Sequence, residues 1–274
     1  INNVLNQVWS SAILEFETIN GNIIWEWHIW DHLIQDVDPN LPNYGIISEH
    51  PELLNINCGD MGAIMPASHA DWMHINSVHY NSSLDQIIIS SRSQSEIYII
   101  DHSTTTEQAA SHSGGNSGKG GDFLYRWGNP SNYNRGDESY YILGNQHSAN
   151  WISSDYPGGG NIIIFNNSPG DGYYYQNNNQ ESEFSNSVII EITPPLDANG
   201  NYIINQNEPY APVNSTWYHE LENLTAFQGG VFRLANGNTL ITENHRIFEI
   251  NDNGQNLWEY NHTDLMGYVA RAKK

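Results

Sequence analysis

Short apolar runs recur along this chain, and each is bounded by Asn, Gly, Asp or Ser residues. Runs of about four to eight such residues between turn-forming residues are typical of β-strands. The stretch 71–101, DWMHINSVHYNSSLDQIIISSRSQSEIYIID, predicts three strands, with NSSLD and SRSQ as the turns between them. The strand FLYRW follows after a polar insertion, so we expect it to complete this unit as a fourth strand.

Two later stretches repeat this plan. The first opens at Gln146-His147 and predicts three strands, NQHSANWIS, NIIIFNNS and NSVIIEIT, followed by a long connection over residues 193–226. The second, GGVFRLANGNTLITENHRIFEINDNGQNLWEY, predicts four strands, and its Asn-Gly turns are strong hairpin signals. We also expect two strands within residues 1–28, an irregular passage over 30–70 and one further strand in the tail GYVARAKK.

The repeat has a period of about 40 residues, which is in the range of propeller blades. The strands expected to close each unit, NIIWEW, DFLYRW and NLWEY, all contain or end in aromatic residues. Four-stranded radial repeats of this kind form β-propellers. The sequence therefore predicts an all-β fold, a single β-propeller domain over residues 1–274 with about four blades, lacking N-terminal blades. Residues 102–121 are expected to form a flexible Gly/Ser-rich insertion.

Composition narrows the possible partners. A net charge of −22 with only nine Lys plus Arg argues against nucleic acid, whose phosphates require a basic surface. No apolar run approaches the 18 or so residues of a membrane span. Cys58 is the only cysteine, so neither an internal disulfide nor a thiolate metal cluster is expected. The chain starts with Ile, so we expect either a removed leader or a start partway through a longer protein, in a secreted or periplasmic setting.

Four motifs, in order, resemble those of the bacterial arylsulfate sulfotransferases: WMHINSVHYNSSLDQIIISSRSQSEIYIIDH, GDFLYRWGNP, the pair NQHSANW and NIIIFNN, and GGVFRLANGNTLIT with RIFEI and LWEY. The resemblance implies a six-bladed propeller that moves a sulfuryl group from a phenolic sulfate ester to another phenol. It also implies a transient sulfohistidine, no nucleotide sulfate donor, no metal and no other cofactor, with the small aryl sulfate and phenol as partners.

The same motifs imply the site residues. His74 and His147 match two active-site histidines of the family, and Arg92 matches its Ser-Ser-Arg. Three further residues are expected to bind substrate: Arg126, Asn76 and Asn167. His245 is the expected third histidine of the site, and His219 is the alternative to it. Arg126 has a second interpretation as a packed or ion-paired residue of its strand.

The residue types fit this chemistry. Sulfuryl transfer spreads negative charge over three oxygens, which positioned cations and hydrogen-bond donors stabilise. A neutral imidazole can act as the nucleophile, and a second can serve as general acid and then base. Histidines that open successive inner strands should converge at one channel mouth, but the sequence does not say which of His74 and His147 is the nucleophile.

Other interpretations stay open. The family places an arginine after its Phe-x-Asn strand, where this chain has NNSPGDGYYYQ with none. That departure favours a non-catalytic propeller that binds a glycan, an aromatic ligand or a protein partner. A quinone-dependent dehydrogenase lacks a convincing calcium-and-quinone constellation. The segment HIWDH has two histidines in H-x-x-x-H spacing, which places both imidazoles on one side only if the segment is helical. Because WEWHIW is typical of a strand, we expect no metal site there.

Overall fold

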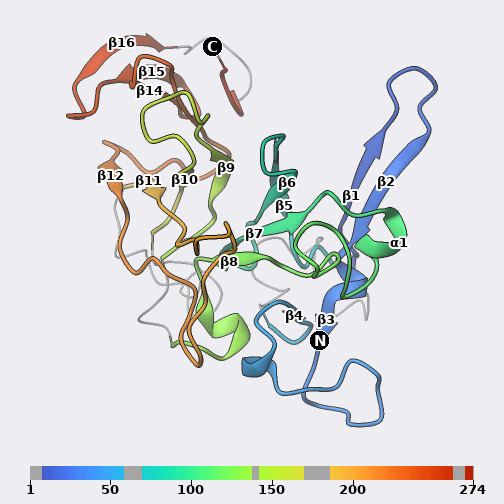
Figure 1. Ribbon diagram of the computed structural model, residues 1–274. Coiled ribbons are helices and arrows are strands. Elements are labelled where there is room, and N and C mark those ends of the chain that lie inside the picture. Colours follow the sequence, from blue (N-terminus) through green and yellow to red (C-terminus); the bar gives the residue numbers. More distant parts are fainter. Residues whose placement is uncertain (1–7, 59–69, 138–141, 170–185, 262–268, 274) are drawn as a thin grey trace.

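The computed structural model describes residues 8–58, 70–137, 142–169, 186–261 and 269–273. Its regular structure is almost entirely β, and it contains three four-stranded antiparallel sheets (Figure 1). The helical elements are single turns, namely η1 (Ile29–His32), η2 (Ile47–Glu49), α1 (Thr106–Ala109) and η3 (Pro130–Tyr133). None of the helices in these ranges is long and apolar enough to cross a bilayer. The all-β prediction is confirmed.

The first sheet has the strand order β5-β6-β7-β8, as the sequence predicts. Its strands are β5 (Ile75–Asn81), β6 (Gln86–Ser91), β7 (Glu96–Asp101) and β8 (Tyr125–Trp127). β6 and β7 are almost wholly buried, because they lie in the middle of the sheet with packed residues on both faces. Their continuous Ile-rich runs are the pattern of strands covered on both sides.

The second sheet consists of β9 (His147–Trp151), β10 (Ile162–Asn166), β11 (Val188–Ile192) and β12 (Trp217–Glu220). The fourth strand, β12, lies within the residues that the sequence suggested were only a connection. Its four residues alternate between half-buried and exposed, and a long loop separates it from β11. A strand this short offers too little periodicity to be recognised.

The third sheet confirms all four predicted strands, β13 (Gly230–Arg233), β14 (Thr239–Thr242), β15 (Arg246–Ile250) and β16 (Asn256–Asn261). The prediction of a strand in the tail is wrong for the residues described there, because residues 269–273 have no regular secondary structure. These residues instead lie along the third sheet, where the Ala272 N–H donates to Thr242 Oγ1 (3.0 Å).

Two smaller sheets complete the fold. The hairpin of β1 (Ala12–Phe16) and β2 (Ile23–His28) confirms the first predicted strand pair and projects from the body (Figure 1). A short parallel pair, β3 (Leu33–Ile34) and β4 (Leu54–Asn55), lies inside the passage expected to be irregular. The polar segment 102–121 contains α1, whose first turn is closed by a capping box between Thr105 and Gln108.

The first strands of the three large sheets are held together by side-chain hydrogen bonds. The Ala149 N–H donates to Ser77 Oγ (3.1 Å), which links β9 to β5. The Val231 N–H donates to Ser148 Oγ (3.2 Å), and Asn150 Nδ2 donates to Val231 O (3.0 Å), which link β13 to β9. Successive sheets therefore meet along their first strands. Among the described residues they do not close into a ring, since β13–β16 and the β1–β2 hairpin lie at opposite ends (Figure 1).

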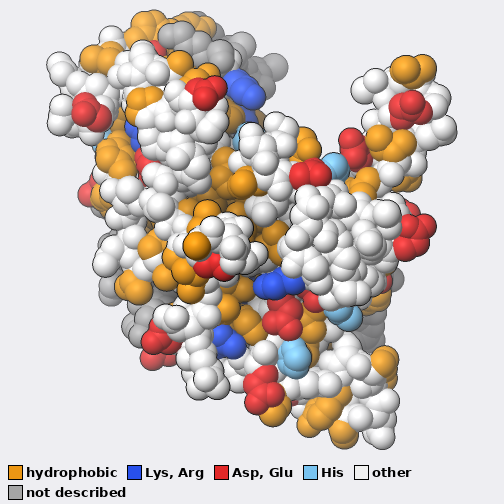
Figure 2. All heavy atoms as spheres, in the orientation of Figure 1, with side chains coloured by type: hydrophobic (Ala, Val, Ile, Leu, Met, Phe, Trp, Pro, Cys, Tyr) orange, Lys and Arg blue, Asp and Glu red, His pale blue; other side chains and the backbone are white. Residues whose placement is uncertain are grey.

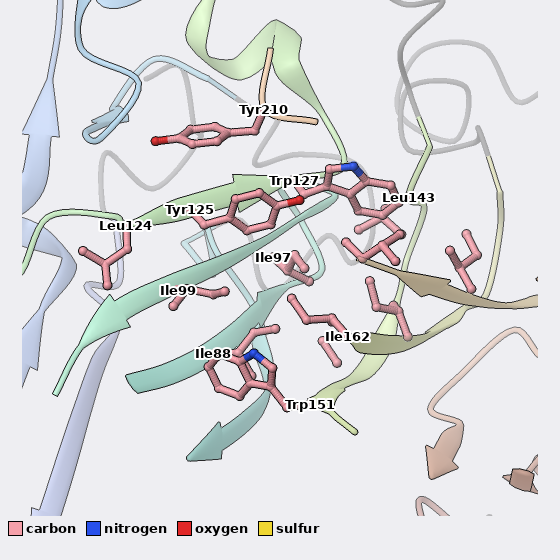
Figure 3. Close-up of a cluster of buried hydrophobic side chains, with 14 of the residues drawn as sticks. Ile88, Ile97, Ile99, Leu124, Tyr125, Trp127, Leu143, Trp151, Ile162 and Tyr210 are labelled. Carbon is pink, nitrogen blue, oxygen red and sulfur yellow. The ribbon is translucent and has the colours of Figure 1, made fainter. Parts of the chain in front are cut away.

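Apolar side chains fill the space between the first and second sheets (Figure 3). Ile88, Ile97 and Ile99 from the first sheet face Ile162 and Trp151 from the second, and all are at most 5% exposed. Full burial of a side chain of this size contributes about 1.5–3 kcal/mol. This cluster fixes the position of β9 against β5, and so the position of the histidines at their ends.

Candidate functional site

The two histidines predicted to matter stand where β5 and β9 begin, and both strands are irregular there. His74 has a φ of +47°, and Asn145 and Ser148, on either side of His147, have φ values of +53° and +56°. Non-glycine residues rarely adopt this left-handed region. The pairing of β5 with β6 shifts between Ile75 and Ser77, and a similar shift occurs between β9 and β10. Bulges of this kind redirect side chains and are common beside active sites.

His147 is held in one tautomer by Asn167. The Asn167 amide Nδ2 donates to the backbone carbonyls of Thr225 and Gln228 (2.7 Å each), so its Oδ1 is the free acceptor. His147 Nδ1 lies 2.9 Å from that Oδ1 and must therefore carry the proton. The lone pair of the neutral ring is then on Nε2. Asn167, expected from the sequence to bind substrate, is fully buried and acts on His147 instead.

The pKa of His147 is lowered to about 4. Burial is the main cause, because it disfavours the imidazolium, and the positive charges of Arg92 and His74 lower the pKa further. Hydrogen bonds with the Asn167 side chain and the Asn145 backbone act in the opposite direction. His147 is therefore neutral at pH 7, and Arg92 and His74 are near enough for their charges to contribute to its low pKa.

His74 is oriented by Asp71, which the sequence reasoning missed. His74 Nδ1 lies 2.5 Å from Asp71 Oδ2, and the His74 backbone N–H donates to Asp71 Oδ1 (3.2 Å). The Nδ1–H is thus committed to the carboxylate, and Nε2 is the ring atom that can exchange a proton with a ligand. The His74 side chain is 48% exposed, in contrast to His147. The sequence signal that could have revealed this pair is a carboxylate three residues before a histidine.

Arg92 is held beside His74 by its own turn. The β6–β7 turn folds back on the entrance to β5, where the Arg92 N–H donates to His74 O and the Ser93 N–H donates to Met73 O (3.2 Å each). Ser91 Oγ also donates to Met73 O (2.6 Å). The Ser-Ser-Arg motif therefore places the half-buried Arg92 next to His74.

Asn76 ties the two strand entrances together. Its Nδ2 donates to Gln146 O (2.7 Å), and Gln146 Nε2 in turn donates to Ser91 O and Glu96 O in the first sheet (2.9 and 3.0 Å). Asn76 Oδ1 is buried and has no hydrogen-bond partner within the described ranges. Asn76 thus fixes the backbone immediately before His147. Gln146, which the sequence marked only as part of a motif, joins the same network.

Arg126 lies apart from this network, in the core. It is 0% exposed, its Nε donates to the Glu96 carboxylate (2.8 Å), and its Nη1 donates to Leu53 O (3.0 Å). Burial alone would lower the pKa of Arg126, but the Glu96 charge more than reverses this and raises it above its usual value. The guanidinium has no surface with which to meet a sulfate ester. Of the two sequence interpretations, the structure supports the ion-paired one.

The two candidates for the third histidine, His245 and His219, belong to different sheets of the structure. His245 is exposed in the turn between β14 and β15, beside Arg246. His219 lies in β12, the outer strand of the second sheet, where its ring stacks on Trp217 (5.9 Å between centroids). Burial lowers the pKa of His219. The assignment of either residue to the site stays a prediction.

A cavity of about 450 Å³ lies at the other ends of the same first strands. Its lining includes His79, Trp151, Phe232 and Lys273. Five residues of extended chain separate His74 from His79, which corresponds to about 16 Å along β5. The cavity is therefore separate from His74 and His147. The candidate site is placed at these two histidines because their side chains can act as nucleophile, acid and base.

The surface around these elements is poor in positive charge. On the face shown in Figure 2, acidic side chains are scattered and basic ones are few and separate. The arrangement combines a neutral half-buried imidazole, an exposed imidazole paired with a carboxylate, and a guanidinium, which together suit the transfer of an anionic group.

The chain is similar to a known family in sequence and, distantly, to two solved structures. The sequence model of the arylsulfotransferase (ASST) family matches residues 3–194. A structure of a protein of unknown function from Bacteroides caccae is similar at 13% identity with a TM-score of 0.34, over 70% of this chain and 47% of that one. The chain thus spans about half the length of that protein. A putative gluconolactonase structure is similar at 8% identity with a TM-score of 0.25, over 81% of this chain and 87% of that one. No curated protein matches.

Proposed function

The chain belongs to the arylsulfotransferase (ASST) family, and we propose that it transfers a sulfuryl group from a phenolic sulfate ester to a phenolic acceptor. We further propose that His147 carries the group as a sulfohistidine. One observation carries this assignment: a neutral, half-buried His147 has its lone pair on Nε2, and the charges of Arg92 and of His74, which pairs with Asp71, act on its pKa.

In the first half-reaction, Nε2 of His147 attacks the sulfur of the ester and the bond from sulfur to the phenolic oxygen breaks. His74, as imidazolium, gives its Nε2 proton to the departing phenolate, so that a neutral phenol leaves. Arg92 holds the sulfuryl oxygens, whose charge grows in the transition state. Asn167 accepts the Nδ1–H bond of His147, which strengthens as the ring becomes positive on forming the N–S bond.

In the second half-reaction, neutral His74 takes the proton of the acceptor phenol, whose oxygen attacks the sulfur. The N–S bond breaks, and its electron pair returns to Nε2 of His147. The acceptor leaves as the sulfate ester, and both histidines regain their starting states. Asp71 stabilises the positive charge that His74 carries in one half of the cycle.

Several wider features belong to the same proposal. The three four-stranded sheets, joined along their first strands, are consecutive blades of a single β-propeller domain, six-bladed in the complete ring. The first strands β5 and β9 would then bring His74 and His147 to one mouth of the central channel. We propose a secreted or periplasmic location and small aryl sulfates and phenols as partners.

The direct test is turnover. The protein is incubated with a chromogenic aryl sulfate, with and without a phenol acceptor, and release of the chromophore is followed. The proposal requires release that depends on the acceptor, together with formation of the acceptor's sulfate ester. A folded protein that releases no chromophore with any of a panel of phenols would overturn it.

The pH dependence follows from the low pKa of His147. Only the neutral ring is a nucleophile, so kcat/KM should rise with pH through about pH 4 and not near the ordinary histidine value of 6.5. Because Arg92 lowers the pKa of His147, Arg92→Ala should move this acid limb to higher pH. Lys119→Ala, which removes an exposed charge elsewhere, is the matched control. An acid limb that stays in place in Arg92→Ala would contradict the assignment.

Asp71→Asn tests the pairing with His74. An amide cannot stabilise the imidazolium as a carboxylate does, so we expect kcat to fall by about 10²-fold with little change in KM, in the range of general acid–base effects. Single-turnover and steady-state kinetics separate the two parameters. Glu52→Gln is the control, since it removes the carboxylate from a comparable pair with His50. Equal rates for Asp71→Asn and wild type would rule out an acid–base role for this pair.

The cavity at the opposite strand ends favours a second candidate function, that of a non-catalytic propeller that binds an aromatic ligand or a glycan. Its lining includes Tyr80, Trp151, Tyr156 and Phe232, which are typical of such sites. Binding of an aryl glycoside that is lost in Trp151→Ala, in a protein without sulfuryl transfer, would favour this function over the enzyme.

A further inference from the structure

A second cluster of potential metal ligands lies away from the paired histidines. His32, His112 and Asp122 each offer one ligand atom, and these atoms lie within 4.8 Å of one another. Nδ1 of His32 and Nδ1 of His112 both approach the same atom, Asp122 Oδ1, at 2.8 Å. His32 ends η1, whereas His112 lies in the polar segment 102–121 and Asp122 directly follows that segment.

The hydrogen bonds of His32 make this contact unusual. Its Nε2 lies 2.8 Å from the Ala109 carbonyl oxygen, which can only accept, so Nε2 carries a proton. A neutral ring then presents its Nδ1 lone pair to a carboxylate oxygen, and two acceptors cannot face each other at this distance unless a cation or a further proton lies between them. Metal-bound histidines in general donate their second ring N–H to a carbonyl or carboxylate in this way.

The surroundings hold the His32 ring firmly. Trp27 stacks on it, with 5.5 Å between centroids and a 4° angle between planes, and Trp27 Nε1 donates to Gly121 O (2.8 Å). A Cβ atom at Gly121 would lie 2.0 Å from Ala109 O and 2.6 Å from His32 Nε2, so only glycine fits. The two partners differ in access, since Asp122 is buried and the His112 side chain is 62% exposed. The cluster is thus rigid on one side and open to solvent on the other.

We propose that His32, His112 and Asp122 bind a divalent zinc ion. Two imidazole nitrogens and one carboxylate oxygen suit zinc, with water as the fourth ligand on the exposed side. Tetrahedral zinc places its ligand atoms about 3.3 Å apart, so both 2.8 Å contacts need to open by roughly half an ångström. Rotation of the exposed His112 ring would open one contact, and a small rotation of the Asp122 carboxylate would open the contact with His32. The ion would fasten segment 102–121 to the end of the β1–β2 hairpin.

This site differs from the H-x-x-x-H arrangement considered in the sequence. His28 bonds Glu26 (3.1 Å) and does not join the cluster, whereas His32 finds its partners 80 and 90 positions further along the chain. The proposal does not depend on sulfuryl transfer, because the cluster lies outside the set of residues used in that reaction. A metal-free enzyme could still turn over aryl sulfate.

The test is calorimetric titration of chelator-treated, full-length protein with Zn²⁺ alone. We expect one ion per chain, and His112→Ala should weaken binding by at least about tenfold, the lower end of losses seen when a metal site is disturbed. His112 is exposed, so this variant should fold as the wild type does. His50→Ala is the matched control, because it removes a histidine paired with Glu52 elsewhere.

A second measurement addresses geometry. Co²⁺ added to the wild type should give the visible absorption bands of a four-coordinate site, and these should be absent in His112→Ala. The proposal is overturned if the folded wild type takes up no stoichiometric zinc. It is also overturned if His112→Ala and His50→Ala bind zinc with the same affinity, since the ion would then lie elsewhere.

Discussion

His147→Ala is expected to lower kcat for sulfuryl transfer by at least about 10³-fold, the largest effect on activity of any single substitution considered for this chain. Loss of a nucleophile removes the covalent route, and in serine proteases the corresponding loss exceeds this value. Steady-state kinetics with a chromogenic aryl sulfate measure the effect.

The comparison needs a variant that removes a histidine without touching the site. His50→Ala serves here, since the His50 side chain is 45% exposed and pairs with Glu52. Circular dichroism shows whether each variant is folded. If His147→Ala keeps more than about a tenth of wild-type kcat while folded, another residue carries the sulfuryl group and the assignment of His147 fails.

Glu96→Gln is expected to have the largest effect on stability, a loss of about 3–5 kcal/mol in the free energy of unfolding. Glu96 and Arg126 are both 0% exposed, and the substitution leaves the guanidinium charge buried without its counter-ion. It also weakens the hydrogen bonds that Asn132 Nδ2 (2.8 Å) and the Tyr98 hydroxyl (2.9 Å) donate to the carboxylate. Urea denaturation followed by tryptophan fluorescence gives the value.

Two further variants separate the buried charge from the loss of contacts. Glu222→Gln breaks an exposed ion pair with Arg246, and pairs of this kind contribute at most about 1 kcal/mol. In the double variant Glu96→Gln/Arg126→Met no charge is left buried, so we expect it to recover part of the stability lost in Glu96→Gln. A loss of less than about 1 kcal/mol in the free energy of unfolding of Glu96→Gln would contradict the expected large contribution of this buried pair to stability.

The strands with clear signals could be predicted from the sequence. β6, β7 and the four strands of the third sheet carry continuous or alternating apolar runs closed by Asn, Gly or Ser turns. β12 could not be predicted, because its four residues alternate over only two half-buried positions and its partner β11 lies beyond a long loop. The tail GYVARAKK has a strand-like composition, but the part described packs along the third sheet without joining it.

The sequence could predict that His74 and His147 open successive first strands and that Arg92 lies in a turn, but their roles in a site stay a prediction. The roles of Asn167 and Asn76 could not be predicted, since they depend on which atoms each amide uses. Arg126 illustrates the opposite limit. The sequence around an arginine in a closing strand does not show whether its side chain binds a ligand or a carboxylate of the protein. Here the partner is Glu96, thirty positions earlier in the chain.

The proposed zinc ligands were also beyond sequence reasoning, for a topological reason. His32 and Asp122 lie 90 positions apart, and only the folding of segment 102–121 against the end of β2 brings them together. The glycine that permits this approach, Gly121, stands in a Gly-rich run whose composition suggests flexibility. A local pattern therefore gave no sign of the contact.

The central claim is that His147 Nε2 accepts the sulfuryl group, and a rapid-quench experiment tests it most directly. The protein is mixed with an aryl sulfate carrying ³⁵S and no acceptor, quenched in alkali, digested and analysed by mass spectrometry. The account predicts up to one acid-labile sulfuryl group per chain, on the peptide that contains His147, which disappears when phenol is added. Label on another residue, or acceptor sulfation without any labelled intermediate, would contradict it.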